Sequence, residues 1–207
     1  MKKFIVLSVC LLFLSYSYDA FAINPQPEPP RIYASGNIGI AFISDSDISE
    51  PGFPTIEVSF DSGFALAGAV GTSFDTFRIE GAIAYQLNDF DSAMGVPLQG
   101  DITSLTFLLN GYYDFINNSP LTPYITGGLG FSMMDVNNLG VAGDIDTFDS
   151  DDTVFAYQLG VGFGYSFNDN LTLDASYRYF ASADPDFDGT TAEVASHNIL
   201  LGFRYNF

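Results

Sequence analysis

The chain has 207 residues, of which 25 are Asp or Glu and 6 are Lys or Arg, so its formal net charge is −19 at pH 7. Nucleic acid is excluded as a partner, because a polyanion needs a basic footprint on the protein. The length suits one medium-sized domain. Cys10 is the only cysteine, which excludes a disulfide framework and a thiolate metal site.

The N-terminal residues have the pattern of a secretory signal peptide. Two lysines precede a mostly apolar run over Phe4–Leu14, and Ala20-Phe21-Ala22 supplies the small-x-small cleavage pattern. The run is too short to cross a bilayer as a helix. We expect cleavage after Ala22. The predicted organisation is a signal peptide over 1–22, a proline-rich periplasmic leader over 23–31 and a single domain over 32–207.

Bulky apolar residues alternate with small or polar residues in eight segments, as in half-buried β-strands. The pattern is clearest in Phe155–Phe167, where Gly, Ala, Gln and Ser hold the even positions. The eight segments are Ile32–Ser44, Gly63–Phe74, Phe77–Leu87, Ser104–Phe115, Tyr124–Met134, Phe155–Phe167, Leu171–Phe180 and Ala195–Phe207. This even number of strands predicts an all-β, eight-stranded, antiparallel up-and-down barrel.

The connections between these segments alternate in length, which is typical of outer-membrane barrels. Asp75-Thr76 and Asn168–Asn170 are short, and Ile116–Pro123 is of moderate length. The four long connections are Asp45–Ser62, Asn88–Thr103, Asp135–Val154 and Ala181–Val194. We expect the short turns and both termini on the periplasmic side, and the long loops on the extracellular side.

The composition of the two strand faces favours a transmembrane barrel over a soluble one. Small residues suit the crowded interior of a narrow barrel, whereas an exterior in water would carry Lys, Glu or Thr. Charged residues also fall on the small-residue face, with three arginines matching three carboxylates, as expected where ions must pair. These inward residues are Arg78, Glu80, Asp114, Asp174, Arg178 and Arg204.

The inward charges have two interpretations. Eight strands leave an interior just wide enough to be filled by side chains, which predicts a structural plug of paired charges. The alternative is a narrow channel for small solutes, in which the same residues would line the path.

The last strand places Phe203, Tyr205 and Phe207 on the bulky apolar face. A terminal aromatic residue on an alternating last strand resembles the signal that outer-membrane barrels present to the barrel-assembly machinery. We therefore expect that machinery, periplasmic chaperones and outer-membrane lipid as partners.

Several motifs resemble those of the surface-antigen family of small barrels, often called the porin family or Opa-like, which are relatives in architecture of OmpA and OmpX. The resemblance covers nearly all of the chain after the signal peptide. It implies a surface-exposed antigen or adhesin-like protein and no reaction. Its motifs are Arg78-Ile-Glu80, Leu109–Phe115, Pro123–Gly130, Tyr157–Gly162, Tyr177–Phe180 and His197 with Gly202–Phe207.

His197 is the only histidine, so any histidine-based catalysis must use it. His197 is an even number of positions from Phe207 on the same strand, so it points outward as Phe207 does. The adjacent Ser196 must point to the opposite face, and the two residues therefore cannot form a catalytic dyad. We expect no enzymatic activity and no cofactor. The alternative from a different functional class is a lipid-modifying outer-membrane enzyme.

The long connections carry many acids and no lysine or arginine. Asp184–Gly189 matches the opening of a calcium loop, but Ala195 stands where the closing Glu belongs. The hypothesis is weak calcium binding, near 10⁻⁴–10⁻³ M, shared between loops. Its candidate ligands are Asp144, Asp146, Asp149, Asp184, Asp186 and Asp188. The loops are also where we expect any host or surface ligand to bind.

Overall fold

The computed structural model describes residues 30–44, 46–49, 56–93, 95–143, 148–183, 186–187, 190–192 and 194–207. The predicted signal peptide and nearly all of the predicted leader lie outside these ranges. None of the described residues belongs to a helix long and apolar enough to cross a membrane.

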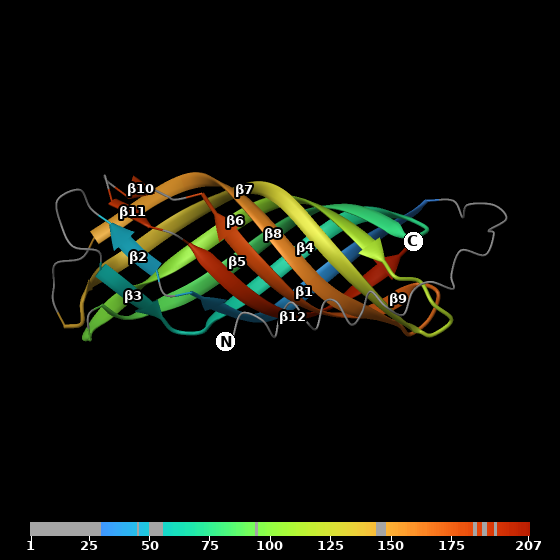
Figure 1. Cartoon of the computed structure of the whole chain (residues 1–207), viewed down its shortest axis with the longest axis horizontal. Helices are drawn as coiled ribbons and strands as arrows, with labels where there is room; N and C mark the ends of the chain where they lie inside the picture. Colours follow the sequence, from blue (N-terminus) through green and yellow to red (C-terminus); the bar gives the residue numbers. More distant parts are fainter. Residues whose placement is uncertain are drawn as a thin grey trace, which may run out of the picture.

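Eight long strands close into a ring in which each strand pairs with two antiparallel neighbours (Figure 1). The ring follows the chain order, and β12 closes it by pairing with β1. Each strand covers one of the eight predicted segments, so the predicted antiparallel barrel is confirmed. The strands are β1 (Arg31–Ile43), β4 (Gly63–Phe74), β5 (Phe77–Ala93), β6 (Val96–Asp114), β7 (Leu121–Val141), β8 (Phe148–Ser166), β9 (Leu171–Ser182) and β12 (Ala195–Asn206).

One end of the barrel carries the short turns and the end of the chain. Asp75, in the turn between β4 and β5, has a φ of 48°, a left-handed conformation that Asp tolerates better than most residues. The Asn168 side chain accepts hydrogen bonds of 2.9 and 2.8 Å from backbone N–H groups two and three residues later. Such bonds explain why Asn is favoured in turns. Phe207 N donates to Ile32 O at 3.0 Å, so β1 begins where the chain ends.

The opposite end, called the loop end below, contains more strand than the sequence indicated (Figure 1). The prediction of long loops over Asn88–Thr103 and Asp135–Val154 is wrong, because β5, β6, β7 and β8 fill most of both ranges. Short strands also form in the other two long connections, and they extend the sheet from β5 in the order β3, β2, β11 and β10. These are β2 (Ser46–Ser49), β3 (Ile56–Phe60), β10 (Asp186–Phe187) and β11 (Thr190–Ala192).

The alternation of side chains reverses where the barrel continues into the loop end. Along most of its length, bulky apolar side chains point outward. In the loop-end extension, apolar side chains such as Phe90 and Ile102 are buried inside. Acids such as Asp89 and Asp101, directly opposite each other on β5 and β6, occupy the outward positions. Apolar inside and charged outside is the arrangement of a barrel in water. The reversal therefore marks one edge of the apolar outer band.

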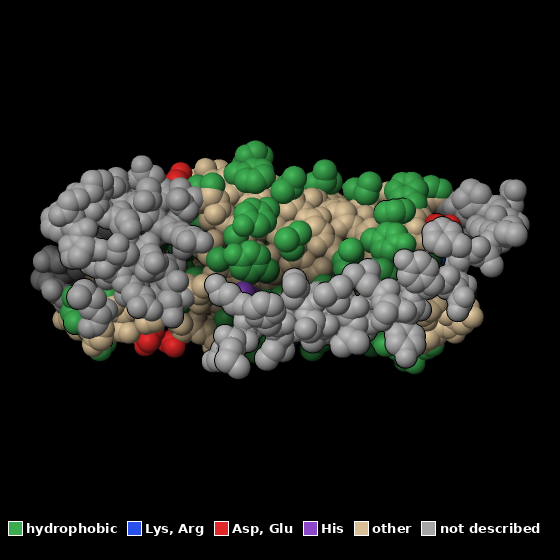
Figure 2. All heavy atoms as spheres, viewed as in Figure 1, with side chains coloured by type: hydrophobic (Ala, Val, Ile, Leu, Met, Phe, Trp, Pro, Cys, Tyr) green, Lys and Arg blue, Asp and Glu red, His purple; other side chains and the backbone are tan. Residues whose placement is uncertain are grey.

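Tyrosines border this apolar outer band at both ends. On β8, Tyr165 lies toward the short turns and Tyr157 toward the loop end, and both are partly exposed. The strand between them spans about 26 Å, or about 20 Å along the barrel axis at the usual tilt. Hydrophobic side chains cover the middle of the face in Figure 2, with acids toward its ends. Outer-membrane barrels have such an apolar band about 25 Å tall, flanked by aromatic girdles.

Candidate functional site

The barrel interior brings together the six predicted charged residues on its inner face. Arg78, Glu80, Asp114 and Arg178 are buried, and Asp174 and Arg204 are partly buried. Five of them lie close to the short-turn ends of β5, β6, β9 and β12. Arg178 lies farther along β9, opposite Gly160 on β8, and its Nη2 donates to Tyr112 Oη at 3.3 Å.

Arg78 and Asp114 form an ion pair across the neighbouring strands β5 and β6. Arg78 Nε donates to Asp114 Oδ2 at 2.7 Å, and Arg78 Nη2 donates to Asp114 Oδ1 at 2.8 Å. The guanidinium also lies 4.1 Å from the ring centroid of Tyr112 and 5.0 Å from that of Tyr124. Two parallel bonds and two aromatic faces hold this cation in one geometry.

Glu80 is held by neutral donors. Its Oε1 accepts from Tyr112 Oη at 2.5 Å and from Asn110 Nδ2 at 3.1 Å, and its Oε2 accepts from Tyr33 Oη at 3.0 Å. The network continues as Gln158 Nε2 donates to Asn110 Oδ1 at 2.7 Å. These bonds link β1, β5, β6 and β8 across the barrel lumen.

Asp174 and Arg204 come close to each other without a hydrogen bond between them. A Cβ placed on Gly164 would lie 3.3 Å from Arg204 Nη2 and 3.4 Å from Asp174 Oδ1. Asp174 Oδ1, Arg178 Nε and Arg204 Nη1 are buried without a hydrogen-bond partner among the described residues. The polar bonds are therefore concentrated on the β5–β6 side of the lumen.

Sequence reasoning missed three tyrosines that build this network, namely Tyr33, Tyr112 and Tyr124. None of the three was predicted as an inward residue, although Tyr112 is two residues from Asp114 on the same strand and must therefore point inward as well. Inner-face glycines make room for such large side chains. A Cβ on Gly162 would lie 2.6 Å from Tyr124 Cζ.

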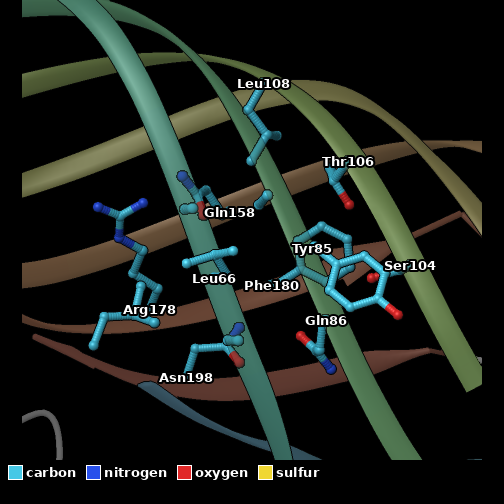
Figure 3. A pocket seen from close by; sticks show the side chains of 14 residues that line it. Leu66, Tyr85, Gln86, Ser104, Thr106, Leu108, Gln158, Arg178, Phe180 and Asn198 are labelled. Atoms are coloured by element: carbon cyan, nitrogen blue, oxygen red, sulfur yellow. The ribbon is translucent and has the colours of Figure 1, made fainter. Parts of the chain in front are cut away.

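A small cavity of about 40 Å³ lies beyond the network toward the loop end. Arg178 and Gln158 line one side and Phe180 and Ser104 the other (Figure 3). A water molecule needs about 10–15 Å³ of such volume, so the cavity has room for a few waters.

The lumen beyond this cavity is filled mainly by apolar side chains, although Asn88 is also buried there and donates to Ala41 O and Asp61 O. Met134, Val154, Ala156, Phe180 and Val194 form one buried cluster. Phe90, Ile102 and Val136 form a second, against which side chains such as Leu98 and Leu139 pack. Side chains therefore occupy the described interior from the short turns to the loop end, apart from small cavities.

The outer face shows no dyad at His197. Ser196 points inward and donates from Oγ to Gln86 Oε1 at 3.1 Å. His197 points outward, where its Nδ1 lies 2.6 Å from Tyr177 Oη. The serine and the histidine are thus on opposite sides of the barrel wall.

The predicted assembly residues line the outer face of β12. Phe203, Tyr205 and Phe207 are all exposed, and the rings of the last two pack edge to face at 5.3 Å. Recognition of these residues by the barrel-assembly machinery stays a prediction.

The side chains of the predicted calcium ligands Asp144, Asp146, Asp149, Asp184, Asp186 and Asp188 lie outside the described part of the chain. Within that part, no three His, Cys, Asp or Glu residues are grouped so that they could hold a metal ion. Weak calcium binding stays a prediction.

Comparisons with known proteins agree with this architecture. A family model described as an outer membrane protein beta-barrel domain matches residues 7–207. PagN, an outer membrane protein of Salmonella typhimurium (strain LT2), is 28% identical over 133 residues, covering 57% of this chain and 56% of PagN. Major surface antigen 4 of Anaplasma marginale is 28% identical over 99 residues, covering 47% of this chain and 30% of the antigen.

The chain thus spans about half the length of PagN and less of the antigen. The crystal structure of Neisserial surface protein A shares the fold, with a TM-score of 0.61 and 21% identity over 87% of this chain and all of that one. Because the family model covers nearly the whole sequence, the chain belongs to the family of outer membrane proteins with a β-barrel domain, and its place is the bacterial outer membrane.

Proposed function

We propose that the protein is a closed, non-enzymatic barrel that displays its acidic loop end on the cell surface, as an antigen and contact module. The observation that carries this proposal is the filled lumen. A bonded polar network occupies the half near the short turns, and two apolar clusters occupy the loop end. Eight-stranded barrels of this kind have interiors that side chains fill.

The proposed orientation puts the short turns and both termini in the periplasm. It is supported by the general asymmetry of bacterial barrels, which have short periplasmic turns and longer extracellular loops. The name of one relative, a major surface antigen, describes that protein as exposed on the cell, and we extend the description to this chain. In the same orientation, residues 1–22 would be removed on export and residues 23–31 would stay in the periplasm.

Introduced cysteines test this orientation directly, because the natural cysteine lies in the proposed signal peptide. Ala142→Cys places a thiol at the loop end, and Asn118→Cys places one in a turn at the opposite end; both positions are exposed. A membrane-impermeant maleimide added to intact cells should label Ala142→Cys alone, and both variants should react after lysis. Labelling of Asn118→Cys alone in intact cells would reverse the orientation.

A narrow channel is the second candidate, favoured by the cavity and by the unpartnered atoms of Asp174 and Arg204. Conduction would require the apolar cluster around Met134 and Phe180 to move, since its side chains are buried in the lumen. An enzymatic role has no comparable support, because His197 and Ser196 face opposite ways.

A further inference from the structure

An exposed apolar patch lies at the tip of the loop end, where two hairpins meet. Val96 is 46% exposed and Val141 is 50% exposed, and the neighbouring Pro97 and Ala142 are also exposed. Ala142 N donates to Pro97 O at 3.1 Å, which joins the β5–β6 hairpin to the end of β7. These four residues, called the tip patch below, are therefore contiguous rather than scattered.

The tip patch adjoins the apolar cluster of the loop end. Leu98 lies opposite Val141 in the β6–β7 ladder and packs against the cluster of Phe90, Ile102 and Val136. The two valines do not belong to that cluster, so their side chains are not needed to fill it. A preorganised surface loses little conformational entropy when it binds a partner.

Acids lie on the outer face of the strands that lead to the tip patch. Asp89 and Asp91 are exposed on the outer face of β5, and Asp135 and Asp151 are exposed and directly opposite each other on β7 and β8. Like charges placed across a ladder repel each other. All the basic residues lie elsewhere in the sequence, at Lys2, Lys3, Arg31, Arg78, Arg178 and Arg204, and the last three are inside the barrel.

We propose that the tip patch and its acidic surroundings bind a basic protein segment that carries apolar side chains. Charge complementarity favours a cationic partner and would repel anionic glycans, which share the sign of this surface. The apolar tip then supplies the contacts that a purely electrostatic encounter lacks. This inference rests on the proposed function, since it needs the loop end to face outward.

The test uses the folded protein in zwitterionic nanodiscs, with empty nanodiscs subtracted and a chelator present. Three peptides of equal length are compared: one alternating Lys and Leu, one of Lys and Ser, and one alternating Glu and Leu. Heparin is a fourth probe. The Lys–Leu peptide should bind most tightly, the Lys–Ser peptide more weakly, and the two anionic probes not at all.

Variants separate the two parts of the surface. Val96→Ser with Val141→Ser should weaken binding of the Lys–Leu peptide roughly tenfold, because about half of each valine is available for burial. The same double variant should leave Lys–Ser binding unchanged. Ile116→Ser, which alters an exposed apolar residue at the opposite end, is the matched control and should bind as the natural protein does. Each variant is first checked for its folded band on an unheated gel.

Undiminished Lys–Leu binding by the double valine variant would overturn the proposal, as would equal binding of heparin or of the Glu–Leu peptide. Failure of these binding experiments leaves the cysteine-labelling result intact, so an error in the partner chemistry is distinguishable from an error in the orientation.

Discussion

Replacing Asp114 with alanine should destabilise the barrel by about 3–5 kcal/mol, because Arg78 would remain buried without its carboxylate. The two side chains are only 12% and 5% exposed, so solvent screens their interaction little. The bonds of 2.7 and 2.8 Å would be lost together. The rings of Tyr112 and Tyr124 would remain beside the guanidinium and would offset only about 1–2 kcal/mol.

The cost should come from the orphaned charge rather than from the lost pair itself. Arg78→Met combined with Asp114→Leu should therefore cost much less than the sum of the two single changes, since apolar replacements of buried ion pairs are often close to neutral. Asp151→Ala, at an exposed carboxylate, should stay within about 0.5 kcal/mol.

The free energy of unfolding of the natural protein and of these five variants is measured by equilibrium unfolding with urea in lipid vesicles. Unfolding is followed as the loss of the circular-dichroism signal of β-strands. The reasoning is refuted if Asp114→Ala costs less than about 1 kcal/mol, or if the double variant costs as much as the two single changes added together.

Three further changes test the outer and inner faces. Gly162→Ala should destabilise the barrel by about 1–3 kcal/mol, because the added Cβ would clash with the buried ring of Tyr124. Gly81→Ala should be tolerated, because a Cβ there would meet no neighbouring atom. Equal losses of unfolding free energy in the two variants would contradict the assignment of the inner and outer faces. Val161→Arg, in the middle of the apolar outer band, should lower the unfolding free energy by about 2–4 kcal/mol, and Thr153→Arg, near the loop end, should lower it far less. Similar losses in both variants would contradict the position assigned to the band. Deleting Phe207 should slow assembly in cells more than it lowers the stability of the folded barrel in vitro. A normal assembly yield in a pulse-chase experiment would contradict the role of Phe207 as an assembly signal.

The eight barrel strands could be predicted because lipid on one side and a narrow lumen on the other impose a strict alternation of side chains. The same criterion missed the loop-end strands. Around Phe90 and Ile102 the apolar residues point inward and the acids outward, so a search for apolar outward faces reads these segments as polar loops. Both residues were assigned to the loop Asn88–Thr103, although each is an even number of positions from an inward residue of its own strand, Glu80 or Asp114, and would point inward if the strand continued.

The membership of the inner ionic set was predictable from parity, whereas its bonding was not. The register of β5 against β6 places Glu80 opposite Asn110, and Tyr33 reaches it from β1 after the barrel has closed. Such contacts depend on curvature and closure, which a single sequence does not encode locally. Tyrosine is also ambiguous, because its ring suits the outer girdle and its hydroxyl suits the polar lumen.

Planar-bilayer recording of the purified, folded protein tests the filled lumen most directly. The account predicts that the natural protein inserts without producing unitary current steps, because the network around Arg78 and the apolar cluster around Phe180 occupy the lumen. Reproducible steps of fixed size in the natural protein, changing when Glu80 or Asp114 is neutralised, would contradict it and identify the inner charges as a conduction path.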